Sequence, residues 1–309
     1  MEHVYDMIVL GGGPGGYTAA LYGTRAGLDT LILEKMTPGG QMALTHQIDN
    51  YPGFSEGIDG FTLGMQMQQQ AERFGARTVM TEVLAVELEK PVKRIVTDSG
   101  EYLAHAVVLS TGANPRPLGV PGEEKYLGRG IHYCAACDGM FYRGKTVVVV
   151  GGGNTAAADA LLLSRVAKEV HLVHRRDSLR ATKIYHDPLL QAENVHIHWN
   201  SAVSALTETD GQLSGVVLRN VQTGEESPLS CHGGFVSIGR DPASALFRGQ
   251  VTLDEAGYVV ADESTKTNLP GVFAVGDLRT KALRQVITAA SDGAMAAYAA
   301  EEYLAEVGR

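Results

Sequence analysis

The stretch MIVLGGGPGGYTAALYGTR, residues 7–25, decides the predicted fold class. It contains a short apolar run, a cluster of glycines and a segment whose apolar residues follow helical spacing. A second apolar run covers residues 30–33 and is followed by Glu34. Continuous apolar runs of this length are typical of strands in a parallel sheet that is buried on both faces. The order of strand, glycine turn, helix and strand predicts a Rossmann-like α/β unit.

The same order returns in the middle of the chain, in TVVVVGGGNTAAADALLLSR, residues 146–165. A second apolar strand is predicted over residues 169–173. The chain is therefore predicted to be an α/β protein with two Rossmann-like dinucleotide-binding domains.

Two proline-containing segments mark the predicted domain crossings. Residues 114–117, Asn-Pro-Arg-Pro, interrupt any regular element, and Arg-Asp-Pro at 240–242 does the same. The chain after the second crossing holds one predicted strand, residues 271–277, and one predicted helix, residues 286–307, which are too little for a domain. We therefore expect the second domain to be inserted into the first. The predicted boundaries are 1–114 and 244–309 for the first domain and 115–243 for the inserted one.

The composition excludes several classes of protein. The 309 residues include 26 Lys and Arg against 35 Asp and Glu, a net charge of −9, which argues against a nucleic-acid-binding surface. No apolar run approaches the roughly 20 residues that cross a bilayer, and the N-terminal residues do not resemble a secretory signal. Three cysteines are too few for a disulfide framework. We expect a cytoplasmic protein that binds neither nucleic acid nor membrane.

The first glycine turn has the spacing of a diphosphate site. Gly11, Gly13 and Gly16 can supply the tight turn, the close approach to a ligand and the close contact between helix and strand. The amides at the start of the following helix would bind the diphosphate. Glu34 ends the second strand, and its carboxylate can accept hydrogen bonds from ribose hydroxyls. This unit is therefore predicted to bind a nucleotide with a free 2′-hydroxyl.

The second glycine turn predicts a different ligand. Gly151, Gly153 and Ala156 take the matching positions, but His174-Arg175-Arg176 comes after the second strand. Guanidinium groups bind a 2′-phosphate through forked, charge-assisted hydrogen bonds, whereas a carboxylate would repel it. Arg180 is a candidate third contact. The pattern predicts NADPH, and a solvated basic surface segment is the alternative interpretation.

A pair of cysteines lies shortly before the second glycine turn. Cys134 and Cys137 have the C-x-x-C spacing, which lowers the pKa of one thiol and allows a reversible disulfide. Half of a zinc site and two unrelated buried cysteines are the alternatives, but only His132 and Cys231 remain as further zinc ligands, so no metal site is predicted. Asp138, next to Cys137, is a candidate general acid.

Two dinucleotide units and a thiol pair together predict an electron relay. Nicotinamide transfers hydride, and a flavin is the natural intermediary between a hydride and a disulfide. The strand GVFAVGD, residues 271–277, ends in Asp277, whose carboxylate is a candidate partner for the ribityl chain of a flavin. The first unit is therefore predicted to bind FAD.

Further motifs occur in the order found in a known family. They are GGQ at 39–41, NYPG at 50–53, CAACDG at 134–139, HRRDSLRA at 174–181 and GDLRTKALRQVITAASDG at 276–293. With the two glycine turns, these motifs make the sequence resemble the low-molecular-weight thioredoxin reductases over most of its length. The resemblance implies a homodimeric flavoprotein disulfide reductase that passes electrons from NADPH through FAD and the Cys134–Cys137 disulfide to thioredoxin.

The resemblance also implies a role for individual residues. Cys137 would be the sulfur nearest the flavin, Cys134 would attack the disulfide of thioredoxin, and Asp138 would supply a proton. The implied FAD-binding residues are Gly11, Gly13, Gly16, Glu34, Gln41, Asn50, Gly112, Asp277, Arg284 and Gln285. The implied NADPH-binding residues are Gly153, Thr155, His174, Arg175, Arg176 and Arg180. The inserted domain is expected to rotate on the two crossings.

Two positions depart from the family pattern. Ala158 stands where the family commonly has a glutamate, with Asp159 after it, and Arg240 lies in a segment where the family varies. Three alternatives stay open: a relative that takes electrons from ferredoxin, an FAD-dependent dithiol oxidase that passes electrons to oxygen, and a flavoprotein that senses redox state without catalysis. The His174-Arg175-Arg176 segment argues against the first two, and no extra binding domain supports the third.

Overall fold

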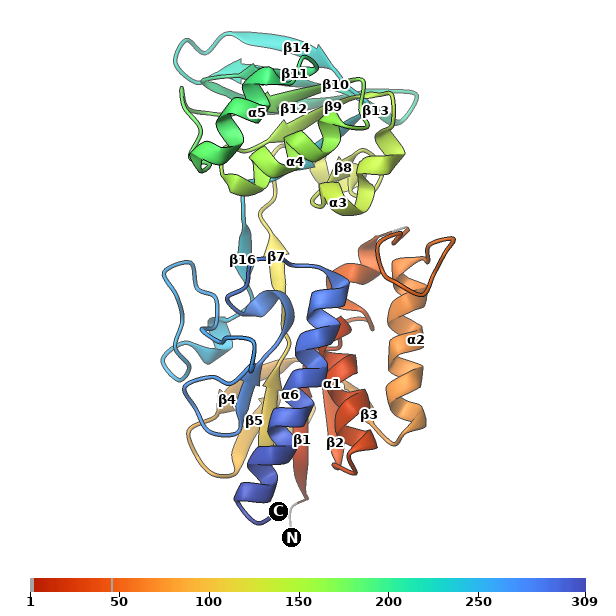
Figure 1. Ribbon diagram of the computed structural model, residues 1–309, viewed down its shortest axis with the longest axis vertical. Helices are drawn as coiled ribbons and strands as arrows, with labels where there is room; N and C mark the ends of the chain where they lie inside the picture. The colour runs from red at the N-terminus through yellow and green to blue at the C-terminus, as the bar shows by residue number, and fades with distance from the viewer. Residues whose placement is uncertain (1–2, 46) are drawn as a thin grey trace. The chain divides into compact units, whose positions relative to one another are not determined.

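The computed structural model describes residues 3–45 and 47–309 (Figure 1). The chain forms two compact units, one made of the residues up to Asn114 together with Asp241–Arg309, the other of Pro115–Arg240. The chain thus re-enters the first unit at Asp241, whereas the sequence predicts residue 244. Backbone pairing accounts for the difference. β7 (Ala113–Pro115) pairs with β16 (Arg240–Pro242), and the Ala243 amide donates to the Gly112 carbonyl at 2.9 Å.

A seven-stranded sheet forms the centre of the first unit, in the order β3-β2-β1-β6-β5-β4 with β17 paired to β6. Its strands are β1 (Val4–Leu10), β2 (Thr30–Glu34), β3 (Arg77–Met80), β4 (Val83–Glu87), β5 (Lys93–Thr97), β6 (Gly100–Leu109) and β17 (Val272–Ala274). β1 is parallel to β2 and β6, whereas β5 is antiparallel to both of its neighbours. The parallel strands β1, β2, β3, β6 and β17 form one half of the sheet.

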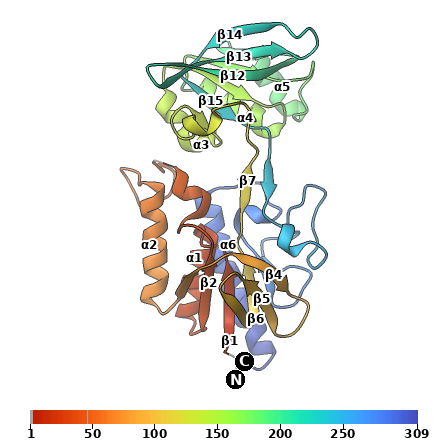
Figure 2. The same cartoon turned by 180° about the vertical axis from the view of Figure 1, so that it is seen from behind.

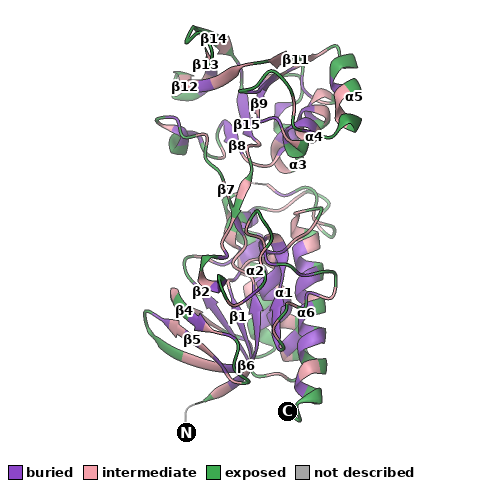
Figure 3. Ribbon diagram, turned by 90° about the vertical axis from the view of Figure 1, so that its left-hand side faces the viewer, coloured by how far each residue is buried: buried purple, intermediate pink, exposed green. Residues whose placement is uncertain are grey.

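The two faces of β1 pack against different partners. Met7 and Val9 belong to the core under α1 (Pro14–Arg25), α2 (Gly60–Arg73) and α6 (Val286–Glu306). Ile8 and Leu10 belong to a second core with residues of β4 and β5. All four side chains are fully buried, as expected for a central parallel strand, and Figure 3 shows β1 and the inner sides of α1 and α6 as buried.

A five-stranded parallel sheet forms the centre of the second unit, in the order β11-β10-β9-β15-β8. Its strands are β8 (Ile131–His132), β9 (Thr146–Val150), β10 (Glu169–Val173), β11 (Val195–His198) and β15 (Gly233–Val236). On one face, α4 (Asn154–Ser164) packs its alanines against Val147 and Val149. On the other, Val148 packs against the antiparallel strands β12 (Ser201–Thr209), β13 (Gln212–Asn220) and β14 (Glu226–Ser230), seen in Figure 2.

The parallel strands of both units share one order. β3-β2-β1-β6 in the first unit corresponds to β11-β10-β9-β15 in the second. Strand order reverses between β1 and β6 and between β9 and β15, and ligands of such sheets bind beyond the carboxyl ends of the strands at this point. The predicted fold class is confirmed. None of the helices in the described part of the chain has the length and apolar character needed to cross a bilayer.

Candidate redox and dinucleotide sites

The predicted thiol pair lies in a single helical turn of the second unit. Cys134 precedes α3 (Ala135–Asp138), and its sulfur is bonded to that of Cys137, with the two Cα atoms 5.3 Å apart. The amides of Cys137 and Asp138 donate to the Cys134 carbonyl at 3.3 and 3.1 Å. The turn therefore holds the two sulfurs together and keeps the Asp138 backbone beside Cys134.

The Asp138 carboxylate is bonded to a buried histidine. Its Oδ2 lies 3.0 Å from Nδ1 of His132, and Nε2 of His132 lies 2.7 Å from the Tyr142 hydroxyl. The side chain of His132 is 5% exposed and that of Asp138 is 14% exposed. Within residues 3–45 and 47–309, no group of three His, Cys, Asp or Glu side chains is arranged to hold a metal ion. His132, a possible zinc ligand by its sequence position, instead connects Asp138 to Tyr142.

Tyr133, which precedes Cys134, is tied to the segment near the first crossing. Its hydroxyl donates to Glu123 at 2.6 Å, and the same carboxylate accepts the amides of Leu118 and Gly119 at 2.8 Å each. Burial, reinforced by Glu123, raises the pKa of Tyr133, so the hydroxyl stays protonated and donates. Hydrogen bonds to Glu123 thus join the start of the inserted unit, at Leu118 and Gly119, to Tyr133, the residue before the disulfide.

Asp159, next to the departing position Ala158, and Arg240, the other departing position, belong to one polar cluster. Asp159, which follows Ala158, accepts the Ser237 hydroxyl at 2.5 Å, and Arg240 attracts its charge. Burial raises the pKa of Asp159, against the opposing effects of Ser237 and Arg240. Arg240 also donates to the Tyr133 carbonyl at 3.4 Å. Asp159 of α4 is therefore linked through Arg240 to Tyr133, the residue before Cys134.

The glycines of the first turn differ in what restricts each position to glycine. Gly11 has a φ of +103°, which L side chains rarely adopt, and it lies against Ser110. A Cβ on Gly16 would overlap the carbonyl oxygen of Gly11, so α1 packs directly on the turn. At Gly13, no described atom lies within 4 Å of the place that a Cβ would take. The packing of the unit does not require glycine at 13, whereas a ligand that approaches the backbone there would.

The second turn repeats this arrangement. Gly151 has a φ of +151°, and a Cβ there would overlap the carbonyl of Ser237. Ala156 is fully buried at the position that corresponds to Gly16. Space around the missing Cβ of Gly153 is again open among the described atoms.

Both turns present helix amides to open space. Gly13 is the N-cap of α1 and Gly153 the N-cap of α4, and no side chain of the described residues caps either helix. The first amides of each helix therefore stay available for an anion. Thr155, a predicted contact, lies exposed in the first turn of α4.

Glu34 is the acid that the sequence assigns to a ribose. It is 8% exposed, and its two oxygens accept the Gly12 amide at 2.6 Å and the Met36 amide at 2.9 Å. These bonds fix the carboxylate beside the glycine turn. Each carboxylate oxygen accepts more than one hydrogen bond, so capacity for ribose hydroxyls remains.

The basic segment after β10 combines one buried and several exposed side chains. His174 is buried, its ring lies against Gly152, and its Nε2 has no hydrogen-bond partner among the described residues. Burial, with the charges of Arg180, Arg176 and Arg175, lowers the pKa of His174, so its ring is neutral near pH 7. The three arginines are exposed, and the Arg180 amide donates to the Gly152 carbonyl at 2.7 Å. The basic segment is thereby fixed to the glycine turn.

The predicted FAD residues from separate parts of the first unit come together in part. Gly40 lies within 3.6 Å of Gly13, measured from the position of its missing Cβ, which brings the GGQ motif to the glycine turn. Gln41 donates to Asn114 at 3.1 Å, and Gly112 follows the Ser110 segment that touches Gly11. These residues surround the carboxyl ends of β1 and β6.

A second group lies at the start of α6. The Asn50 amide donates to Gln285 at 3.0 Å. Arg284 lies over the ring of Tyr258, 4.2 Å from its centroid, and its buried Nε has no hydrogen-bond partner among the described residues. Gly15 of α1 lies against Ala289, so the start of α6 adjoins the first glycine turn.

A buried ion pair supports the turn that carries Asp277. Asp292 of α6 accepts the Gly276 amide at 2.8 Å, Arg279 at 2.7 and 2.9 Å, and Lys281 at 2.7 Å. Burial alone would raise the pKa of Asp292, but Arg279 and Lys281 lower it, so the group stays ionised. The backbone before Asp277 is therefore fixed by charges that the sequence patterns did not single out.

Comparison with known proteins places the chain among disulfide reductases. Residues 5–293 match the pyridine nucleotide-disulphide oxidoreductase family. The chain belongs to this family. A thioredoxin reductase of Mycolicibacterium smegmatis is 48% identical over 306 residues, which are 99% of this chain and 98% of the relative. One of Peptoclostridium acidaminophilum is 44% identical over 310 residues, 98% of each chain. The crystal structure of a thioredoxin reductase from Streptococcus pyogenes superposes with a TM-score of 0.91 at 40% identity, covering 99% of this chain and 100% of that one. The predicted resemblance to thioredoxin reductases is confirmed.

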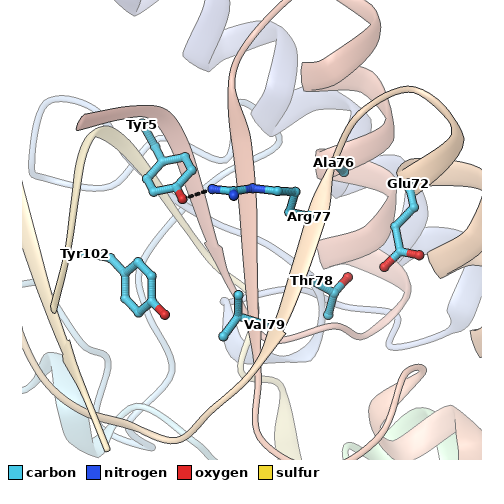
Figure 4. Close-up of a pocket in the computed structure, with 7 residues that line it drawn as sticks. All are labelled: Tyr5, Glu72, Ala76, Arg77, Thr78, Val79 and Tyr102. Atoms are coloured by element: carbon cyan, nitrogen blue, oxygen red, sulfur yellow. Dashed lines mark hydrogen bonds between the residues drawn. The ribbon is translucent and has the colours of Figure 1, made fainter. Parts of the chain in front are cut away.

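The chain also has a surface hollow, separate from the predicted site residues (Figure 4). It is lined by Tyr5, Glu72, Ala76, Arg77, Thr78, Val79 and Tyr102. Arg77 donates to the Tyr5 hydroxyl and lies over its ring. None of the predicted site residues lines this hollow, so we assign no part of the family's chemistry to it.

The sequence patterns did not identify His132, Tyr142 or Asp292 as parts of the redox and dinucleotide sites. His132 bonds to Tyr142, 10 positions later, and Asp292 to Gly276, 16 positions earlier. Turns and strand ends bring these pairs together, so no helical or strand period connects them. The position of His132, two residues before Cys134, is the one sequence signal that pointed to the group of His132 and Tyr142.

Proposed function

We propose that the chain is an NADPH-dependent, FAD-containing reductase of thioredoxin's disulfide. The observation that carries the proposal is the Cys134–Cys137 disulfide in the same unit as the His174-Arg175-Arg176 segment. The thiol pair supplies a two-electron couple, and the basic segment suits a 2′-phosphate. Relatives named thioredoxin reductase, at 44% and 48% identity, support the same activity.

FAD suits the first unit. The open space at Gly13, the uncapped amides of α1 and the carboxylate of Glu34 match a diphosphate and its ribose, and the unpartnered Nε of Arg284 needs an acceptor. When bound, FAD takes a hydride from NADPH and supplies an electron pair to the disulfide. The residues that would hold it are Gly11, Gly13, Gly16, Glu34, Gln41, Asn50, Gly112, Asp277, Arg284 and Gln285.

NADPH suits the second unit. Gly153 leaves room for a diphosphate at the uncapped start of α4, and the unpartnered Nε2 of His174 lies among three arginines. A 2′-phosphate would supply an acceptor and offset the repulsion between the guanidinium groups. The residues that would hold NADPH are Gly153, Thr155, His174, Arg175, Arg176 and Arg180.

The two cysteines transfer electrons to thioredoxin by thiol–disulfide exchange. After reduction, the Cys134 thiolate attacks one sulfur of thioredoxin's disulfide and forms a mixed disulfide, and the other thioredoxin sulfur leaves as a thiolate. Cys137 then attacks Cys134, restores the Cys134–Cys137 bond and releases the second thioredoxin sulfur. The two released thiolates take up two protons, and Asp138, which follows Cys137 in the chain, is the proposed acid.

A homodimer in the cytoplasm is part of the proposal. Ile287, Met295 and Tyr298 share one face of α6 and are 43%, 42% and 57% exposed, which suits a surface that a second copy covers. A reducing compartment suits a disulfide that must open in each turnover. Light scattering of the FAD-loaded protein is expected to give about twice the mass of the 32.9 kDa chain.

The test of the function is NADPH oxidation with thioredoxin as the acceptor, coupled to a thiol-reactive dye. We expect turnover to require both NADPH and thioredoxin, and to fall at least about 1000-fold in Cys134→Ser and in Cys137→Ser. Cys231→Ala is the matched control, because Cys231 is buried outside the pair, and its turnover is expected to stay near that of the natural chain.

Other outcomes identify the alternatives. Full activity in Cys137→Ser contradicts the proposed relay. Failure of both NADPH and NADH to reduce the protein favours the ferredoxin-dependent relative. Rapid peroxide formation from dithiols without NADPH identifies the dithiol oxidase.

A further inference from the structure

The carboxylate of Asp138, the residue after Cys137, is one end of a buried chain of three side chains. His132 lies between Asp138 and Tyr142, with Nδ1 3.0 Å from the Asp138 carboxylate and Nε2 2.7 Å from the Tyr142 hydroxyl. The rings of Tyr142 and Phe235 lie 5.3 Å from that of His132, measured between centroids. The imidazole is therefore fixed on both nitrogens and on its faces.

The charged groups around this chain of side chains are Asp138 and the Lys145 ammonium, which lies 5.6 Å from the centroid of the Tyr142 ring. Asp138 of α3 is the charged partner, and Tyr142 of the adjoining 3-10 turn is the second titratable one. Phe235 of β15 contributes only an apolar ring. Beyond Tyr142 lies the buried thiol of Cys231, whose pKa is raised to about 12 by burial. Burial, followed by Asp138 and Cys231, raises the pKa of Tyr142 to about 12, so its hydroxyl keeps its proton.

This arrangement accepts either protonation state of the imidazole without moving. A neutral ring donates from Nδ1 to Asp138 and accepts the Tyr142 hydroxyl at Nε2. A protonated ring donates from both nitrogens, and the Tyr142 hydroxyl oxygen then acts as the acceptor. Tyr142 can take both roles because a hydroxyl is donor and acceptor.

We propose that His132 is a positioning residue that shares one proton with Asp138, so that the pair, rather than the carboxyl alone, stores the proton that reduction of the Cys134–Cys137 disulfide consumes. The inference rests on the proposed function, in which Asp138 serves the thiol pair. It adds a specific residue to that site and a reason why the site works near neutral pH.

The chemical step balances with one proton. The disulfide takes up two electrons from NADPH and its S–S bond breaks, which leaves Cys137 as a thiolate and converts Cys134 to a thiol with a proton from Asp138. Asp138 obtains this proton from the His132 imidazolium, so one proton leaves the pair, which then consists of an ionised carboxylate and a neutral ring. When Cys134 attacks thioredoxin, its proton returns to the pair and is available for a thioredoxin thiolate.

An imidazole is a stronger base than a carboxylate, so it holds a proton at higher pH. Storage of the proton on the pair therefore extends proton delivery to higher pH than a carboxyl alone allows.

The test is the pH profile of kcat/KM for thioredoxin in His132→Asn, measured with the FAD-loaded protein from pH 6 to pH 8. The asparagine amide takes the place of Nδ1 and keeps a donor for Asp138, but it stores no proton. We expect the ratio of natural to variant kcat/KM to change about tenfold between pH 6 and pH 8. His196→Asn, an exposed histidine of the same unit, is the matched control and is expected to leave the profile unchanged. A ratio that stays constant across this range contradicts the proposal, because a purely structural role has no such pH dependence.

A second measurement needs no folded variant at position 132. In the ¹⁵N spectrum of histidine-labelled natural protein with an oxidised disulfide, Nδ1 of His132 is expected to carry a proton, and an unprotonated Nδ1 in this state would overturn the proposal. Asp138→Asn distinguishes the proposed role of Asp138 from the proposal about His132. If this variant keeps full activity across the pH range, the role of Asp138 fails and this proposal fails with it. If it loses activity while His132→Asn keeps a parallel profile, only the proposal about His132 fails.

Discussion

The two glycine turns each pack a helix close to a strand, but with different residues at the third position of the motif. In the first unit, a Cβ at Gly16 would overlap the carbonyl of Gly11, whereas in the second unit the corresponding Ala156 is buried without conflict. Gly13 and Gly153 are alike, since both leave open space in front of an uncapped helix. The common feature is therefore the open space in front of the helix, and the third glycine depends on how closely the helix approaches its strand.

The units also differ in the charge placed after the second strand. Glu34 accepts two backbone amides and turns a carboxylate to the first glycine turn, whereas the second unit has His174 under the turn and exposed arginines beside it. In the proposed function, opposite charges at equivalent places would let one chain hold two related dinucleotides without exchanging them. Substitutions at equivalent positions of the two units test this difference.

The largest effect is expected from Gly16→Ala. The added methyl group meets the Gly11 carbonyl, so α1 must move away from its strand, and we expect a loss of about 3 kcal/mol or more in the free energy of unfolding together with loss of bound FAD. Urea unfolding and absorbance of the bound flavin measure the two effects. Ala156→Gly, the reverse change in the second unit, is expected to cost only about 1 kcal/mol. Equal effects of the two changes would refute the difference in packing.

Removal of the two guanidinium groups in the Arg175→Ala, Arg176→Ala double variant is expected to raise KM for NADPH about 100-fold, because two charge-assisted contacts with the 2′-phosphate are lost. KM for NADH, which lacks this phosphate, should change little. Steady-state kinetics with both nucleotides measure the selectivity. A similar rise for NADH would show that the arginines do not read the 2′-phosphate.

Acid is expected to destabilise the second unit through its cluster of histidines. Burial, together with His198 and His196, lowers the pKa of His171 to about 4. In the unfolded chain this histidine binds a proton below its ordinary pKa of about 6.5, while the folded form stays neutral until about pH 4, so stability falls as pH decreases through this window. We expect His171 to account for a loss of about 2 kcal/mol at about pH 5 relative to about pH 7.5, measured by urea unfolding. His171→Asn should lose less stability over the same interval, and an unchanged loss would contradict the assignment.

The smallest effect is expected from Gly13→Ala and Gly153→Ala. Neither new methyl group meets a described atom within 4 Å, so the free energy of unfolding without cofactor should change by less than about 1 kcal/mol. We expect an approximately tenfold weaker affinity for FAD in the first variant and for NADPH in the second, because the methyl group blocks the approach of the diphosphate. Fluorescence titration with each cofactor measures this. Weakened binding of both cofactors by either change would contradict separate sites.

Local patterns were sufficient to predict a large part of the fold. Apolar runs ending in glycine clusters identified β1 and β9, and the Asn114–Pro117 segment marked the first crossing, because a buried parallel strand and a proline break each have a strong local signature. The second crossing was displaced by three residues because pairing between β7 and β16 is a long-range contact.

The sequence by itself determined the two Rossmann-like units, the spacing of the thiol pair and the opposite charges after the two second strands, since each of these is encoded in a few consecutive residues. Only the tertiary structure decided that His132 connects Asp138 to Tyr142, that Asp292 supports the Asp277 turn and that Asp159 reaches Ser237. Hydrogen bonds between side chains depend on where strands end and helices pack, and that placement is set by the burial of the whole core rather than by any local period.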